Sequence, residues 1–346
     1  SRGRMNTRFK EAICLIISLM LAACGGAAPS RPTPTPFTGA PRPVIIDTDM
    51  ATDDWLAILY LLNRPDIAIE AITVTGAGEA HCGPGVKNAL GLIALAGQPN
   101  IPVVCGRETP LQGNHAFPAE WREGVDSLNG LTLPDNPNPA STDSAVELLT
   151  TTVQSSPEKM TLLTLGPLTN VAEALQATPE LKDNIEMIVI MGGAVEAPGN
   201  VGDASPTAEW NIYVDPHAAN AVLQSGAPIT LVPLDATNNA PVTMDFYNRL
   251  KADRATPEAK FVFEALTQNL GFLQSGGYYF WDPLAAAILA DESLATFESK
   301  TLIIVEEEGP ESGRTVTSGD GVPVRVAVSA DAKRFEQIFL DTLNAP

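Results

Sequence analysis

Short apolar runs alternate with amphipathic stretches over most of the chain that follows Val44. The runs are VIID, AIEAITVTG, IPVVCG, MTLLTLG, IEMIVIMGG and PITLVPL, and stretches with helical spacing or polar segments separate them. Continuous apolar runs of this length are typical of strands buried on both faces, and helices supply the crossovers that parallel strands require. The pattern therefore predicts an α/β fold: a doubly wound, mostly parallel sheet with helices on both faces.

Three later runs, TLIIVEEEG, GRTVTSG and PVRVAVS, follow one another without a helical stretch between them. They predict antiparallel strands that precede a last helix at 330–343. In open α/β sheets, ligands bind outside the carboxyl ends of the strands. Polar residues just after strands are therefore the candidates for a functional site.

The N-terminal segment does not follow this pattern. Arg8 and Lys10 precede an apolar run over 12–23, which is too short to cross a bilayer but has the length of a signal-peptide core. The run closes with LAAC at 21–24, which resembles a bacterial lipobox, so we expect cleavage before Cys24 and lipidation of this cysteine. The alternative is an ordinary signal peptide with an accidental cysteine.

Residues 25–43 are rich in Pro, Gly and Thr and predict an extended tether without a core of its own. We therefore expect a lipoprotein signal peptide over 1–24, a tether over 25–43 and a folded domain over 44–346. Such a protein would be exported and anchored at the bacterial cell envelope, with contact to the membrane only through lipid on Cys24.

Acidic residues outnumber basic ones, with 41 Asp and Glu against 21 Lys and Arg, and the formal net charge is −20. Most of such a surface repels a phosphate backbone, so nucleic acid is not expected as a partner. Cys82 and Cys105 could form a disulfide in an exported protein. Two separate thiols remain the alternative, because spacing alone cannot bring the two residues into contact.

The stretch VIIDTDMATDDWLAILYLL at 44–62 concentrates Asp47, Asp49, Asp53 and Asp54 between an apolar strand and an apolar helix. A helix N-terminus favours negative charge, but four acids also repel one another. A divalent cation with hard oxygen ligands, Ca²⁺ or Mg²⁺, would relieve that repulsion. A solvated capping turn would explain only one or two of the acids.

A strand followed by D-x-D also opens the haloacid dehalogenase phosphatases. Those proteins carry Thr or Val two residues after the second Asp, where this chain has Ala51. The mismatch counts against that assignment.

Five motifs in order resemble those of the inosine–uridine-preferring nucleoside hydrolases. The opening D-x-D-x-x-x-D-D is formed by the four acids of the acidic stretch. The others are LTLGPLTNVAEAL, IVIMGGAVEAPGN, AEWNIYVDPHAA and WDPLAAAIL. The resemblance covers nearly everything from Val44 to the last helix.

The resemblance implies a Ca²⁺ site made by Asp49, Asp54, Asp282 and the main-chain carbonyl of Leu165, with no organic cofactor. It also implies that the cation holds the attacking water and that Asp49 takes its proton. Asp47 would support the metal ligands rather than touch substrate. Asp282 could alternatively cap the helix PLAAAIL, and such a capping role is compatible with metal binding.

For the sugar, the resemblance implies that Asp53 binds a ribose hydroxyl and that Asn200, Glu209 and Asn211 bind the remaining hydroxyls. Glu209 and Asn211 could alternatively cap a helix that starts at Pro216. Gly78 stands near a point where many members of the family carry Asn, so one ribose contact departs from the pattern.

Trp281 stands where many members carry a His that acts on the leaving base. We expect its indole to stack on the base, as in the purine-specific branch of the family, with Phe117 or Trp121 as a second ring. The alternative is that Trp281 is core packing.

His81 and His115 lie in loops that could border the site and supply an acid. His217 is expected to be structural.

The resemblance implies an enzyme that hydrolyses the N-glycosidic bond of ribonucleosides, purine nucleosides in particular, to base and ribose. A homodimer or homotetramer is compatible with it. The competing hypothesis is an extracytoplasmic nucleoside- or sugar-binding lipoprotein without catalysis, because a lipobox and a Pro-rich tether are common in such receptors.

Overall fold

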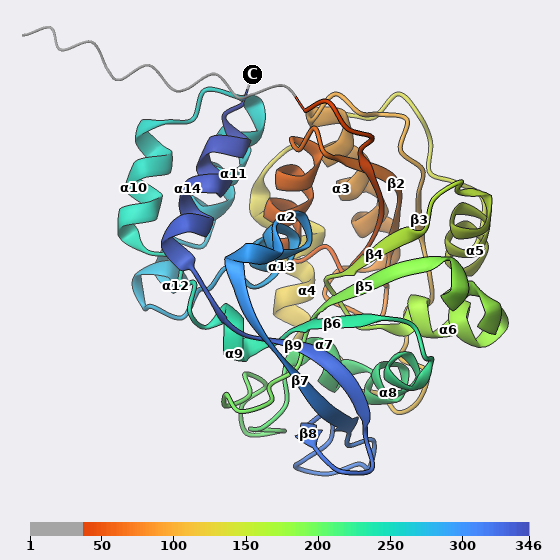
Figure 1. Ribbon diagram of the computed structural model, residues 1–346. Helices are drawn as coiled ribbons and strands as arrows, with labels where there is room; N and C mark the ends of the chain where they lie inside the picture. The colour runs from red at the N-terminus through yellow and green to blue at the C-terminus, as the bar shows by residue number, and fades with distance from the viewer. Residues whose placement is uncertain (1–36, 346) are drawn as a thin grey trace, which may run out of the picture. The chain divides into compact units, whose positions relative to one another are not determined.

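The structure is a computed structural model that describes residues 37–345 (Figure 1). The predicted signal peptide at 1–24, with Cys24, and residues 25–36 of the predicted tether lie outside the described residues. The first strand begins at Arg42, just before the predicted start of the folded domain at Val44. Within the described residues, no helix is both long and apolar enough to span a bilayer.

Nine strands of the described chain form one sheet in the order β3-β2-β1-β4-β5-β6-β9-β7-β8. The pairs from β3 through β6 to β9 are parallel, and β7 pairs antiparallel with both β9 and β8. The strands are β1 Arg42–Thr48, β2 Ile67–Val74, β3 Val103–Cys105, β4 Met160–Thr164, β5 Ile185–Met191, β6 Ile229–Val232, β7 Ala295–Ile304, β8 Thr315–Thr317 and β9 Val322–Ala330. The predicted mostly parallel sheet with antiparallel strands near the C-terminus is confirmed.

The strand order reverses between β1 and β4. From β1 the chain builds outward through β2 and β3, and it then returns to β4 and builds the other half through β5 and β6. The connections that leave these two adjacent strands therefore run in opposite directions along the sheet and leave a crevice at the carboxyl ends of β1 and β4, which is where ligands bind in doubly wound folds. The acidic stretch follows β1 at this point.

Helices cover both faces of the sheet (Figure 1). On β1, Ile45 belongs to the core beneath α5, α6 and α8, whereas its neighbour Ile46 belongs to the core beneath α2, α3 and α13. Alternate residues of a strand point to opposite faces, so a continuous apolar run fills two cores. The helices are α2 Thr52–Leu62, α3 Cys82–Leu95, α4 Ala119–Asp126, α5 Ala145–Ser155, α6 Thr169–Ala177, α7 Trp210–Val214, α8 Pro216–Gln224, α9 Leu234–Thr237, α10 Met244–Ala252, α11 Pro257–Gln268, α12 Leu270–Gln274, α13 Trp281–Ala290 and α14 Ala332–Leu343.

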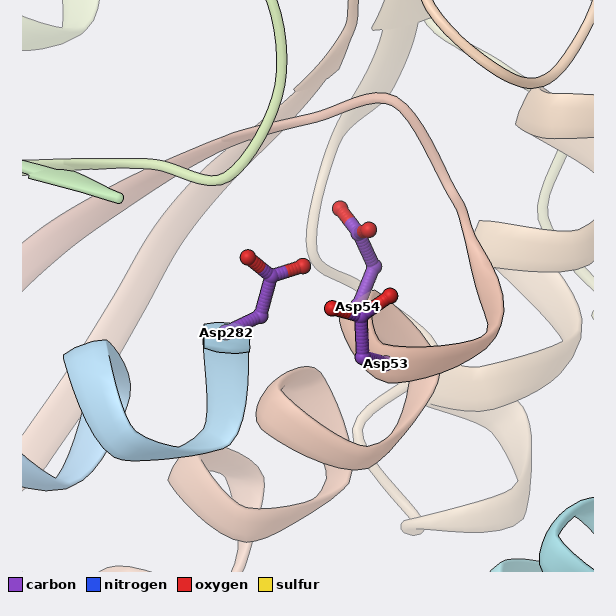
Figure 2. Close-up of side chains that lie close together, drawn as sticks. All are labelled: Asp53, Asp54 and Asp282. Atoms are coloured by element: carbon purple, nitrogen blue, oxygen red, sulfur yellow. The ribbon is translucent and has the colours of Figure 1, made fainter. Parts of the chain in front are cut away.

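The segment between β6 and β7 holds helices that the apolar runs did not predict, α9 to α12. The last helix of this segment, α13, packs against α2. Because α2 and α13 meet near their N-termini, the first turns of both helices lie at the crevice (Figure 2).

A disulfide joins Cys82 at the start of α3 to Cys105 at the end of β3, with the two Cα atoms 5.5 Å apart. This resolves the choice that the sequence left open between a disulfide and two separate thiols. The bond lies at the same edge of the sheet as the crevice, because Cys105 is the last residue of β3 and Cys82 begins the helix that follows β2.

Candidate active site

The acids at the crevice come from two helix starts that are far apart in the sequence. Asp53 and Asp54 stand in the first turn of α2, and Asp282 stands in the first turn of α13 (Figure 2). Each of the three offers a carboxylate oxygen within 4.8 Å of the others. The Asp54 carboxyl is also within hydrogen-bonding reach of Asp49, which follows β1 directly. Three of the predicted metal ligands, Asp49, Asp54 and Asp282, therefore lie together.

The cluster is buried and its charges repel one another. Asp49 and Asp282 are 2% exposed and Asp54 is fully buried. Burial and the neighbouring charge of Asp53 raise the pKa of Asp54 to about 7, and burial raises the pKa of Asp49 and Asp282 well above the usual range. Such an arrangement favours either shared protons or a cation.

The donor atoms of the cluster fit a hard cation. Thr48 Oγ1 donates a hydrogen bond to Asp54 Oδ1, while Asp54 Oδ2 is buried without a partner among the described residues. The main-chain carbonyl of Leu165, just after β4, lies at the same cavity and accepts one hydrogen bond from Asn211 at 3.1 Å. Carboxylate and carbonyl oxygens are the ligands that Ca²⁺ and Mg²⁺ take in proteins. The residues present therefore fit the predicted cation site.

Asp47 lies behind the cluster and does not line the cavity. It is 1% exposed, and its Oδ1 accepts hydrogen bonds from Thr73 at 2.6 Å and Asn170 at 2.8 Å. Burial raises its pKa to about 7, although both hydrogen bonds lower it. This placement agrees with the expected supporting role.

Asp49 is packed between two glycines. A Cβ on Gly78 would lie 2.1 Å from the Cβ of Asp49, and one on Gly166 would lie 2.7 Å from the same atom. No side chain fits at either position with this backbone. The close packing on Asp49 therefore requires glycine at position 78, where many members of the family carry Asn. The next residue, Glu79, also lines the cavity, although it was not among the candidates predicted from the sequence. Its position after β2 was the available signal.

The four residues expected at the sugar, Asp53, Asn200, Glu209 and Asn211, all line the cavity. Glu209 accepts hydrogen bonds from the main-chain N–H groups of Gly193, Asn211 and Ile212 at 2.9, 2.9 and 3.2 Å, so it caps α7 and faces the cavity at once. Asn200 Oδ1 accepts from the main-chain N–H of Trp210 at 3.1 Å. Burial raises the pKa of Glu209.

Two capping alternatives from the sequence are wrong. The helix that starts at Pro216 is capped by Asp215, which accepts from the main-chain N–H of Ala218 at 3.0 Å, and not by Glu209 or Asn211. The helix α13 starts at Trp281 with Phe280 as its N-cap, so Asp282 stands inside the first turn instead of capping the helix. Its carboxylate is thereby directed to the cluster.

Aromatic side chains form a large part of the rest of the cavity wall, and the cavity has a volume of about 620 Å³. Trp281 is half-buried and lies 5.7 Å from Tyr278 and 6.5 Å from Phe272, measured between ring centroids. It is therefore a wall of the cavity rather than core packing alone. Phe272 is 49% exposed at the mouth.

A second aromatic group comes from α4, α7 and the segment before α4. Phe117 stacks on Trp210 with centroids 5.0 Å apart, and Trp121 meets Trp210 at 5.5 Å. All three line the cavity, including both residues expected as a second ring. Trp210 was not singled out in the sequence, although it stands between the two predicted sugar ligands of the AEWN motif.

None of the three histidines, all of which lie in the described part of the chain, lines the cavity. His81 pairs with Asp126 at 2.7 Å, His115 with Glu308 at 3.0 Å and His217 with Glu306 at 2.6 Å. The expectation that His81 or His115 borders the site is not met. Each ring is turned toward a surface carboxylate instead.

A doubly wound α/β fold with a buried acidic cluster and an aromatic-walled cavity at its switch point defines a protein that binds a small polar ligand there. The inosine-uridine preferring nucleoside hydrolase family matches residues 44–337. This chain belongs to that family.

Relatives and solved structures agree with this assignment. The pyrimidine-specific ribonucleoside hydrolase RihA of Citrobacter koseri is 33% identical over 87% of this chain and 97% of its own. The purine-preferring ribonucleoside hydrolase of Gardnerella vaginalis is 31% identical, with a TM-score of 0.75 over 88% of this chain and 98% of its own. A plant nucleoside hydrolase is 30% identical, with a TM-score of 0.81 over 88% of this chain and all of its own.

Proposed function

We propose that this protein hydrolyses the N-glycosidic bond of ribonucleosides to free base and ribose. The observation that carries the proposal is the joining of two features in one cavity: a buried oxygen cluster that fits a cation and two aromatic walls that fit a flat base. Membership of the nucleoside hydrolase family supports the same reaction.

We infer that Asp49, Asp54, Asp282 and the main-chain carbonyl of Leu165 would hold a Ca²⁺. When bound, the cation would polarise the sugar hydroxyls and the attacking water. Ca²⁺ is preferred over Mg²⁺ because it accepts more ligands and looser geometry than an octahedral ion. The proposed ligand set combines side-chain and main-chain oxygens from the ends of β1 and β4 and from the first turns of α2 and α13.

Asp49 is the residue assigned to take the proton of the attacking water. Its Oδ2 accepts a hydrogen bond from the main-chain N–H of Glu79 at 3.1 Å, and its Oδ1 accepts one from that of Ala51 at 3.4 Å. These bonds orient the carboxylate at the proposed cation site, and a carboxylate held in this way can accept the proton of a water bound there. Loss of the base leaves an oxocarbenium-like sugar, which the neighbouring carboxylates stabilise electrostatically.

Asp53 is assigned to a ribose hydroxyl, because it stands beside the cluster and is only half-buried at the cavity. Asn200, Glu209 and Asn211 are assigned to the remaining hydroxyls. The main-chain bonds that Glu209 accepts fix its position before substrate arrives, which lowers the cost of ordering the site.

For the base we propose a purine, held between Trp281 and the Phe117–Trp121 wall. The relatives point in both directions, since RihA is named as pyrimidine-specific and the Gardnerella vaginalis protein as purine-preferring. The two aromatic walls favour the purine because its larger face gains more from stacking.

Turnover separates this proposal from that of a binding lipoprotein. Purified protein with Ca²⁺ should release ribose from inosine, and added chelator should stop the release. A receptor would bind the nucleoside without consuming it. If no free ribose forms from inosine, guanosine, uridine or cytidine with Ca²⁺ present, the enzyme proposal fails.

We further propose that the protein is exported and anchored to the membrane through lipid on Cys24, with the segment between Cys24 and the start of β1 at Arg42 as a tether. The LAAC sequence and the Pro-rich composition support this location.

A further inference from the structure

The loop at 75–81, which connects β2 to α3, lies directly against Asp49. The main-chain N–H of Glu79 donates to Asp49 Oδ2 at 3.1 Å, and that of Ala80 donates to the Asp49 carbonyl at 2.9 Å. Gly78 is so close that a Cβ there would lie 2.1 Å from the Cβ of Asp49. The backbone of this loop therefore sets where the Asp49 carboxylate can lie.

Two groups outside the loop hold it in place. Arg122 of α4 donates from Nη2 to the Gly76 carbonyl at 2.9 Å and from Nε to the Glu79 carbonyl at 3.3 Å. The Cys82–Cys105 disulfide holds the C-terminal end of the loop to the end of β3. A Cβ on Gly76 would lie 2.7 Å from Cys82 Sγ, so the disulfide also packs against the start of the loop.

Without the disulfide, the C-terminal end of the loop is held to neighbouring segments mainly by hydrogen bonds at exposed positions, among them the contact of the His81 ring with Asp126 at 2.7 Å. The main-chain N–H of His81 donates to Asp126 at 2.9 Å, and that of Cys82 donates to Glu108 at 3.1 Å, both at exposed positions. Exposed hydrogen bonds compete with water and constrain a backbone less than a covalent bond does. Loss of the S–S bond therefore frees the C-terminal end of the loop first, and this end adjoins Glu79 and Ala80, whose main-chain N–H groups donate to Asp49.

We propose that the Cys82–Cys105 disulfide is a redox-sensitive positioning device for Asp49, so that the oxidised protein binds Ca²⁺ firmly and the reduced protein binds it weakly. The inference rests on the proposed function. A dithiol reductant would break the S–S bond and form two thiols, giving two electrons and two protons and closing to its own disulfide. Both cysteines are half-buried, which leaves the bond within reach of a small dithiol.

The test measures the Ca²⁺ dissociation constant by calorimetry on the oxidised protein and again after dithiothreitol. We expect it to rise about tenfold or more on reduction, as when a group that orients a metal ligand is lost, and to recover on reoxidation. Nucleoside turnover at limiting Ca²⁺ should follow the same course. The double variant Cys82→Ser/Cys105→Ser should bind as weakly as the reduced protein and should not respond to dithiothreitol.

The control variant is Val153→Ala, which opens a cavity in the core beneath α5, far from the loop in the sequence. It should lower Tm and leave the Ca²⁺ dissociation constant unchanged. A control that weakens Ca²⁺ binding as much as reduction does would overturn the inference, because binding would then only report global stability.

Three further results would also overturn it: equal Ca²⁺ affinity before and after reduction, loss of the helical circular dichroism on reduction, or free thiols at both Cys82 and Cys105 in protein purified without reductant. Failure of the oxidised protein both to bind Ca²⁺ and to turn over any nucleoside would defeat the proposed function, and this inference with it.

Discussion

Asp49 is held by backbone from two sides before any ligand is present. The backbone at Gly78 and Gly166 packs so closely on its Cβ that neither position has room for a side chain, and the main-chain N–H of Glu79 orients one oxygen. A residue that is constrained in this way can serve both as a metal ligand and as a base without large reorganisation during the reaction.

Asp49→Asn should lower kcat by at least about 100-fold, because an amide cannot take a proton from water. The fold should remain, since Asn keeps the size and one oxygen of the side chain. Steady-state kinetics with inosine and a melting curve measure both effects. The exposed Asp320→Asn is the matched control and should behave as wild type. A near-normal kcat in Asp49→Asn would remove the assignment of the base.

Asp54 should make the stability of the metal-free protein depend on pH. Burial raises its folded-state pKa from 3.8 to about 7, so it contributes stability below about pH 4 that is lost as the pH rises through 7. A single pKa unit corresponds to about 1.4 kcal/mol. In EDTA, Asp54→Asn should therefore be more stable than wild type at pH 8 by at least that amount.

The difference between the two proteins should disappear near pH 4, where Asp54 is protonated. Denaturant melts in EDTA at several pH values measure it. Added Ca²⁺ at pH 8 should stabilise the wild type more than the variant. If the free energies of unfolding of the two proteins changed with pH in parallel, the ionisation of Asp54 would not be what destabilises the metal-free protein at high pH.

At the scale of elements, the relative position of α2 and α13 determines the geometry of the acidic cluster. Their N-termini meet at the crevice, and the positive ends of both helices face the acidic cluster, which favours ionised carboxylates. Successive residues of α13, Trp281 and Asp282, serve the proposed base site and the proposed cation site. The placement of one helix therefore couples the two.

Trp281→Ala should lower kcat more than it raises KM for purine nucleosides. An indole beside the purine binds it and also favours a positive charge on the departing ring, as a cation–π contact does. Stacking of about 1–3 kcal/mol corresponds to a loss of roughly 5- to 150-fold. Wild type should also cleave inosine or guanosine with higher kcat/KM than uridine or cytidine.

The matched control is Phe272→Ala, whose ring is 49% exposed at the mouth and should matter less. Uridine cleaved as efficiently as inosine would remove the purine assignment and leave the hydrolase assignment intact.

At the scale of the whole molecule, the reversal of strand order between β1 and β4 gathers residues from most of the chain at one edge of the sheet. The cavity collects side chains that follow β1, β2, β4, β5 and β6 and side chains from α4 and α13. No single segment carries the site, so its geometry depends on the packing of both cores.

The proposed anchor also acts on the whole molecule. Cys24→Ala should move the protein from the membrane fraction to the soluble fraction, because firm anchoring needs more than one acyl chain and the cysteine would carry them. Cys14→Ala, which changes a cysteine inside the predicted signal peptide, should leave the fractionation unchanged. The lipobox assignment would be refuted if the Cys24 variant stayed with the membrane.

The sequence by itself determined the α/β class, the order of most elements and the residues of the acidic stretch. These follow from patterns within short windows: a continuous apolar run predicts a buried strand, and four acids between a strand and a helix predict a crowded charge. The resemblance added Asp282 and the AEWN residues, which now lie at one cavity with the acids.

Only the tertiary structure decided which distant residues meet. It joined Cys82 to Cys105, placed Glu79 and Trp210 at the cavity, turned the three histidines away and made Gly78 a packing requirement of Asp49. Local patterns report burial and backbone preference, whereas contacts between segments depend on how two cores pack around a twisted sheet, which no short window contains.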